Sequence, residues 1–286
     1  MRTSTKVILS IVLAVCVAVF LFAGYQLFSI LNEYKQARDY YDGMADTYAS
    51  TEQPAEHTPE PSPIGTPAAD PNADAAQIGE ASVEDEKEYS PLSVDFDKLL
   101  SVNDEVCGWI YSPDTAINYV IAQAEDNNQY LHHLLDGSYS EGGTLFMDCE
   151  CAPNFAGANS IIYGHNMRDG SMFRSLTSYR EQSYYDAHPV LYLNTPTQNY
   201  KIEVFTAYTC NYDSDTYMLS FASEQDYMDY LTKMKSQSDF ECDVMPTSAE
   251  RVITLSTCTY EYDNARYVVQ GKLIPLDMPP AEQPAA

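Results

Sequence analysis

The stretch RVITLSTCTYEYDNARYVVQGKL, residues 251–273, predicts two β-strands joined by a short connection. Polar and apolar residues alternate up to Cys258, and a β-branched and aromatic pattern resumes after Arg266. If the two strands pair antiparallel, Cys258 and Arg266 stand side by side, about 5 Å apart at the backbone. The sequence therefore places a thiol next to a permanent cation.

A neighbouring guanidinium suits Cys258 to nucleophilic chemistry. A cation beside a cysteine favours the thiolate, which is the nucleophilic form. The same cation can stabilise an oxyanion that develops on a substrate carbonyl. The alternative interpretation is that Cys258 is a small apolar residue ending a core strand.

A second segment supplies a base for this nucleophile. The sequence SIIYGHNMRDGSM, residues 160–172, is a short apolar strand that breaks at Gly164 and presents His165 in a polar loop. A histidine just past a strand end is what a cysteine nucleophile needs for proton transfer. The rival base is His188, which directly precedes a proline and a further strand.

The motif TLSTC, with an arginine eight residues after its cysteine, and IIYGHNMRDGSMF upstream resemble the sortases, specifically their class B branch. The resemblance covers roughly residues 95–276. By position, the family's catalytic cysteine, histidine and arginine fall on Cys258, His165 and Arg266. The resemblance implies a mainly β fold, a closed eight-stranded barrel with peripheral helices, and chemistry that needs no metal or cofactor.

This resemblance implies a cysteine transpeptidase that anchors surface proteins. The cysteine would attack a peptide carbonyl in a C-terminal sorting signal, which in class B is associated with motifs of the NPxTN kind, and form a thioester. An amine of a peptidoglycan precursor would then resolve the thioester and join the surface protein to the cell wall. The alternatives are a hydrolytic cysteine peptidase, a pilin-polymerising sortase, and a tethered surface binding domain without catalysis.

Four residues near the nucleophile have less specific roles. Ser256 and Thr257 border the cysteine and are candidate substrate-binding residues. Ser256 shares the face of the thiol because side chains alternate along a strand. Glu261 and Asp263 either orient the arginine or the histidine, or belong to a solvated loop.

Composition excludes several partners and site types. The chain has 42 acidic and 15 basic residues, a formal charge of −27. Such a charge argues against nucleic acid as a partner, because counterion release needs basic residues, and against broad adhesion to an anionic membrane. The seven cysteines are irregularly spaced, so a disulfide framework is not favoured. A zinc site built from His132, His133, Cys149 and Cys151 lacks the usual ligand spacing.

The N-terminal region predicts a single membrane anchor and a tether. Residues 7–31 are apolar and long enough to cross a bilayer. Basic residues within 1–6 predict a cytoplasmic N-terminus and an extracellular catalytic domain; a cleaved signal peptide is the alternative. Residues 32–50 predict a juxtamembrane helix. Residues 51–90, rich in proline and acidic residues, predict a disordered linker that would let the domain move clear of the lipid.

The catalytic domain is predicted at residues 91–278, followed by a flexible tail at 279–286. Many short strands with turns between them favour a barrel or a sandwich, and the sortase resemblance selects the barrel. Strands are predicted to begin at residues 108, 117, 144, 160, 190, 198, 252 and 266, with helices within 93–102, 171–180 and 223–236.

Overall fold

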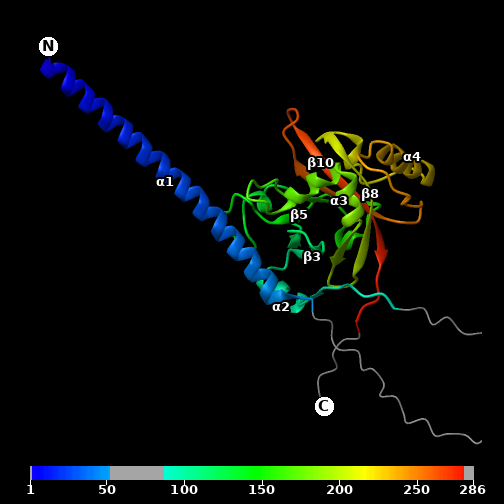
Figure 1. Ribbon diagram of the computed structural model, residues 1–286. Coiled ribbons are helices and arrows are strands. Elements are labelled where there is room, and N and C mark those ends of the chain that lie inside the picture. The colour runs from blue at the N-terminus through cyan, green and yellow to red at the C-terminus, as the bar shows by residue number, and fades with distance from the viewer. Residues whose placement is uncertain (1, 52–86, 280–286) are drawn as a thin grey trace, which may run out of the picture.

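The computed structural model describes residues 2–51 and 87–279. At its centre lies a closed barrel with the strand order β10-β8-β7-β3-β4-β5-β6-β9, which confirms the predicted eight-stranded barrel (Figure 1). The barrel strands are β3 (Val106–Tyr111), β4 (Asn118–Ala122), β5 (Leu145–Met147), β6 (Asn159–Tyr163), β7 (Val190–Asn194), β8 (Tyr200–Asn211), β9 (Val252–Cys258) and β10 (Ala265–Pro275).

Two barrel pairs are parallel, and one of them builds the site. β4 pairs with β5 and β6 pairs with β9 in parallel, whereas the remaining barrel pairs are antiparallel. Because β6 and β9 run in the same direction, their C-terminal ends reach the same rim of the barrel. The two motifs singled out in the sequence lie at those ends.

The two faces of β9 pack against different parts of the molecule. Leu255 of β9 and Val269 of β10 belong to the cluster that fills the barrel interior. Val252 and Val268 belong to a cluster on the outer face, which is covered by α4 (Glu224–Lys235). Since side chains alternate along a strand, Cys258 is on the outer face with Val252.

The predicted helices form with shifted bounds. α2 (Phe96–Val102) is capped by Asp95, whose carboxylate accepts the Lys98 N–H. Ser223 caps α4 through the Asp226 N–H, as the capping box predicts. The segment within 171–180 forms the 3₁₀ helix η3 (Phe173–Arg180). The other short helices are α3 (Gln182–Ala187), η1 (Gln129–Leu131), η2 (Pro153–Phe155) and η4 (Asp215–Tyr217).

A single long helix precedes the barrel. α1 (Arg2–Tyr48) contains both the predicted membrane segment and the predicted juxtamembrane helix. Among the described residues it is the one helix long and apolar enough to cross a membrane, and its apolar side chains between residues 7 and 31 are exposed. Its C-terminal part packs on the barrel, where Tyr41 and Met44 are buried (Figure 1).

The chain around the predicted linker is anchored at both described ends. β1 (Ala49–Ser50) pairs antiparallel with β2 (Ser93–Val94). Ser90, which we assigned to the linker, is buried and donates to Asn194 Oδ1 at 2.8 Å. Residues 52–86 of the predicted disordered linker and residues 280–286 of the predicted flexible tail lie outside the described residues.

Candidate active site

The parallel pairing of β6 with β9 brings the histidine loop to the cysteine. Tyr163 is the register partner of Ser256, and the Gly164 N–H donates to the Ser256 carbonyl at 3.1 Å. His165 follows Tyr163 by two residues, as Cys258 follows Ser256. Both functional side chains therefore begin at the same level of the same rim.

Arg266 completes this arrangement from the next strand. It is the register partner of Cys258 in the antiparallel β9–β10 pair, as the sequence predicts. Both residues are half-buried, and the Arg266 guanidinium makes a 3.1 Å hydrogen bond to the Ala265 carbonyl. The cation and the thiol therefore share one face of the hairpin, and each is partly exposed.

Asn166, which sequence reasoning missed, ties the histidine loop to Cys258. Its Nδ2 donates to the Cys258 carbonyl at 2.7 Å, and its Oδ1 accepts from Arg174 Nη1 at 2.9 Å. Asn166 is buried. Because it directly follows His165, one amide group holds the backbone of both catalytic candidates at a fixed spacing.

The imidazole of His165 is held on an edge and on a face. Its Nε2 lies 2.8 Å from the Leu131 carbonyl, and its ring stacks on His132, with centroids 5.3 Å apart. A carbonyl only accepts, so Nε2 carries the proton and Nδ1 is free to exchange one. Burial lowers the pKa of His165 from its ordinary value, which keeps the ring neutral near pH 7.

Comparison with known proteins gives the same assignment. Residues 110–274 match the Sortase domain family. The chain is 39% identical over 178 residues to sortase B of Listeria monocytogenes, which spans 62% of this chain and 72% of that protein. The chain belongs to the sortase family. As with its sortase B relatives, its class is B and its activity is that of a cysteine transpeptidase.

Solved structures of class B sortases share its fold. Sortase B from B. anthracis, crystallised in complex with AAEK1, has a TM-score of 0.65 at 30% identity and covers 86% of this chain and 99% of its own. A Staphylococcus aureus sortase B–substrate complex has a TM-score of 0.61 at 32% identity and covers 64% of this chain and 86% of its own.

The rival base lies elsewhere in this sortase. His188 directly follows α3, and its ring packs on Tyr184 with centroids 4.5 Å apart. His188 lies two residues before Val190, which pairs with Glu203 of β8. Glu203 pairs in turn with Lys272 of β10, which lies near the end of that strand opposite to Arg266. His188 therefore stands away from Cys258 and cannot serve as its base.

The two predicted substrate-binding residues, Ser256 and Thr257, lie on opposite faces of β9. Ser256 lies on the face of Cys258 and is 1% exposed, and its Oγ is hydrogen-bonded to the Tyr217 hydroxyl at 2.8 Å. Thr257 is 2% exposed and alternates to the interior face. Thr257 thus has no path to a substrate on the outer face, and Ser256 can act only through its neighbours.

The loop between Cys258 and Arg266 carries one of the predicted carboxylates into an ion pair. Glu261 pairs with Arg180, whose guanidinium carbon also lies 4.7 Å from the centroid of the Tyr267 ring. Glu261 therefore holds the loop against η3 and does not orient Arg266. Asp263 is exposed.

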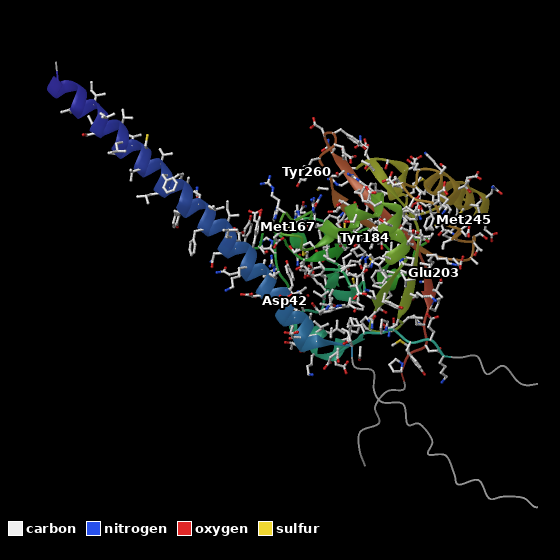
Figure 2. All side chains as sticks on the ribbon, viewed as in Figure 1. Asp42, Met167, Tyr184, Glu203, Met245 and Tyr260 are labelled. Carbon is white, nitrogen blue, oxygen red and sulfur yellow. The ribbon has the colours of Figure 1, made fainter. Side chains whose placement is uncertain are left out.

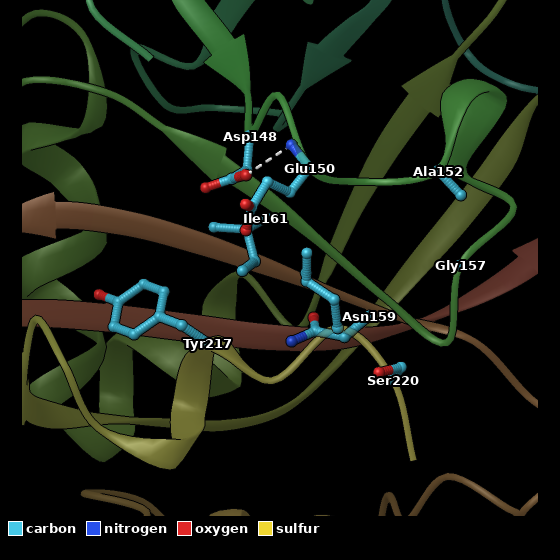
Figure 3. Close-up of a pocket in the computed structure, with 9 residues that line it drawn as sticks. Asp148, Glu150, Ala152, Gly157, Asn159, Ile161, Tyr217 and Ser220 are labelled. Atoms are coloured by element: carbon cyan, nitrogen blue, oxygen red, sulfur yellow. Dashed lines mark hydrogen bonds between the residues drawn. The ribbon is translucent and has the colours of Figure 1, made fainter. Parts of the chain in front are cut away.

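A pocket of about 590 Å³ opens on the outer side of β6, between the loop after β5 and the segment around η4 (Figure 3). Tyr217 lines it and links it to Ser256, two residues before Cys258. The Asp148 carboxylate in its wall accepts from the Tyr163 hydroxyl at 2.9 Å and from the Glu150 N–H at 2.9 Å. Burial raises the pKa of both tyrosines, so both hydroxyls stay protonated.

The cysteines and histidines considered above for disulfides or zinc have other surroundings. Among the described residues all seven cysteines are free, and no cluster of three or more His, Cys, Asp or Glu side chains is placed to hold a metal. His132 stacks on His165, while the Cys151 thiol is buried and accepts the Ile161 N–H at 3.3 Å.

Proposed function

We propose that Cys258, His165 and Arg266 are the nucleophile, the proton-transfer group and the oxyanion-stabilising cation of this sortase. The observation that supports this assignment is their convergence at one rim, through the register of β9 with both β6 and β10. A thiol, an imidazole with a free nitrogen and a guanidinium are the groups that acyl transfer through a thioester requires.

The first half-reaction forms the thioester. Nδ1 of His165 takes the thiol proton, and the sulfur of Cys258 attacks the carbonyl carbon of the scissile peptide bond. Arg266 stabilises the negative charge on the carbonyl oxygen. The imidazolium returns its proton to the leaving nitrogen as the C–N bond breaks, which leaves the acyl group on sulfur and a free amine product.

The second half-reaction transfers the acyl group. An acceptor amine attacks the thioester carbonyl, His165 takes the proton of that amine, and the sulfur departs. The proton then passes back to the sulfur and restores the thiol. The acyl donor is a surface protein with a C-terminal sorting signal, and the acceptor is an amine of a peptidoglycan precursor.

The pocket beside β6 extends the path of the donor peptide. It shares Tyr217 with the site through the hydrogen bond to Ser256, and β6 runs from its wall, at Asn159 and Ile161, towards His165. Residues of the sorting signal that precede the scissile bond therefore have a groove to occupy.

α1 supports a proposed location at the cell membrane. Its exposed apolar stretch is the length of a bilayer crossing, and Arg2 and Lys6 flank its start. By the preference of basic residues for the cytoplasmic side, the N-terminus is cytoplasmic and the catalytic domain is extracellular. The enzyme then works where surface proteins and wall precursors emerge.

Incubation with a sorting-signal peptide, with and without an amine acceptor, tests the proposal. We expect an amine-dependent ligation product, whereas hydrolysis unaffected by amine would favour a peptidase. Cys258→Ala should abolish turnover and the covalent adduct.

The matched control is Cys242→Ala. Cys242 is also half-buried and lies 2.7 Å from a cation, Lys235 Nζ, but packs on a different part of the barrel. This variant should retain activity. Turnover that survived loss of Cys258 would refute the assignment of the nucleophile.

A further inference from the structure

The C-terminal part of α1 contacts the loop that carries His165. Arg38 Nη2 lies 3.1 Å from Asp169 Oδ2 in the loop between β6 and η3. The Tyr41 hydroxyl donates to the Gly143 carbonyl, and its ring meets Tyr119 edge-on with centroids 5.4 Å apart. The docked face of α1 therefore contacts the surroundings of the active site.

A second set of contacts fixes the direction of the helix. Met44 is buried in a cluster with Leu99 and Trp109, and the Asp95 N–H donates to the Tyr48 carbonyl at 2.8 Å. The β1–β2 pair follows directly. Contacts from residue 38 to residue 50 hold both the tilt and the rotation of α1 on the barrel, whereas the sequence predicts that the linker at 51–90 lets the domain move clear of the lipid.

The length of helix between lipid and site is short. The apolar stretch ends at Leu31, and Arg38 follows seven residues later in the same unbroken helix. At 1.5 Å per residue this separation is about 10 Å. Because Arg38 contacts the loop that follows His165, the catalytic rim lies about that far from the end of the apolar stretch.

Exposed aromatic residues occupy the same side of the barrel. Tyr260, in the loop between β9 and β10, is 80% exposed, and Tyr139, which stacks on His132, is 60% exposed. Figure 2 shows Tyr260 and Met167 on the side towards the N-terminal half of α1, with Asp42 farther along the helix. Tyrosines are enriched at membrane interfaces, where their amphipathic rings sit at headgroup level.

We infer that α1 is a rigid post that holds the active-site rim over the lipid headgroups, so that the enzyme selects scissile segments lying close to the membrane surface. The inference rests on the proposed membrane anchor. The contacts along α1 carry it, because the chain's net charge of −27 does not favour attraction to an anionic surface. The substrate is a peptide whose scissile bond lies about 10 Å from its own apolar anchor.

The inference is tested by varying the length of α1 and the distance between the scissile bond and the apolar span of the substrate. The full chain is reconstituted in liposomes with peptide substrates in which zero to twenty residues separate the scissile bond from an apolar span. We expect turnover to peak near a spacer of about three extended residues. Seven helix-forming residues inserted between Leu31 and Asn32 add about 10 Å and nearly two whole turns, and should move the peak about three residues longer.

The matched control places the same seven residues within positions 52–86. The contacts that hold α1 on the barrel are made by residues 38–50, so an insertion within 52–86 leaves them in place and the peak should not move. A peak that ignores the insertion after Leu31, or that moves equally with the insertion in 52–86, would overturn the inference.

A second measurement does not depend on turnover. Tyr260→Trp should be quenched by lipids brominated near the headgroups, and Met278→Trp, on a residue after β10 that is 43% exposed, should not. Undocking α1 with Arg38→Glu and Tyr41→Ala should remove the quenching at position 260. Quenching that is equal at both positions, or absent at 260, would refute the orientation.

The two proposals can fail separately. If a soluble sorting peptide is ligated normally but spacer length has no effect, the chemistry stands and the rigid post is wrong. If quenching appears as expected while no peptide is turned over, the orientation stands and the catalytic proposal is wrong.

Discussion

Loss of the Asn166 amide should separate Cys258 from His165, the proposed nucleophile and base. In Asn166→Ala the Cys258 carbonyl and Arg174 Nη1 lose hydrogen bonds of 2.7 and 2.9 Å in a buried position. Leaving a buried polar group unpaired costs about 1–3 kcal/mol. Because the freed carbonyl belongs to Cys258 itself, that cost falls on the arrangement in which sulfur meets imidazole. At about 1.4 kcal/mol per tenfold, kcat/KM should fall roughly 5- to 150-fold.

The assay compares kcat/KM for an amine-dependent ligation with the free energy of unfolding in urea. The matched control is Asn194→Ala. Asn194 is also buried and also makes two hydrogen bonds, to the Leu92 carbonyl at 2.6 Å and from Ser90 Oγ at 2.8 Å, but at a distance from Cys258. It should lose stability and keep activity.

Asn166→Asp separates the two bonds of Asn166. The carboxylate still accepts from Arg174 but cannot donate to the Cys258 carbonyl, so its activity should fall at least as far as that of the alanine variant. If Asn166→Ala stays within twofold of the wild type, or loses no more activity than Asn194→Ala, the positioning role is refuted.

Three further outcomes follow from the same geometry. The acid limb of the kcat/KM profile should lie below about pH 6.5, because burial lowers the pKa of His165. His132→Phe keeps the ring stack but removes the electrostatic effect of His132 that lowers the pKa of His165, so the limb should move to higher pH; an unmoved limb would exclude His132 as an influence. Tyr217→Phe removes the hydroxyl that binds Ser256 Oγ at 2.8 Å. The lost hydrogen bond should cost about 0.5–1.5 kcal/mol of transition-state stabilisation, which steady-state kinetics would detect as a fall in kcat/KM of up to about tenfold. Gly164→Ala would place a methyl 2.4 Å from a leucine side chain of β5 and 2.7 Å from the ring of Phe173, so urea unfolding should show a loss of about 1–3 kcal/mol; unchanged stability would mean that the loop yields easily.

The barrel and its central hairpin were predictable because their signals are local. Alternation along residues 252–258 determines which face each side chain takes, and a short connection forces the antiparallel register that joins Cys258 to Arg266. Strand starts shifted by only a few residues, as for β3 at Val106 instead of residue 108. Propensity and alternation specify an element's type better than its ends.

The supporting residues were not predictable because their partners are distant in sequence. Asn166 and Cys258 are 92 residues apart, and His132 and His165 are 33 apart. Nothing in the local pattern of two adjacent histidines distinguishes a surface position from a ring stacked on the proposed base. The docking of α1 was missed for the same reason: aromatic residues at helical spacing indicate a buried face but not the surface that buries it.

The pairing of β1 with β2 holds the chain before residue 52 to the chain after residue 86 without relying on the segment between them. A protease that cuts within residues 52–86 would divide the chain, yet the fragments would remain joined by the strand pair and by buried Tyr41 and Met44. If the catalytic domain is extracellular, as proposed, clipping there would therefore not release the catalytic fragment from the cell. The same division offers a split enzyme, in which a piece ending at residue 51 and a piece beginning at residue 87 reassemble when produced separately.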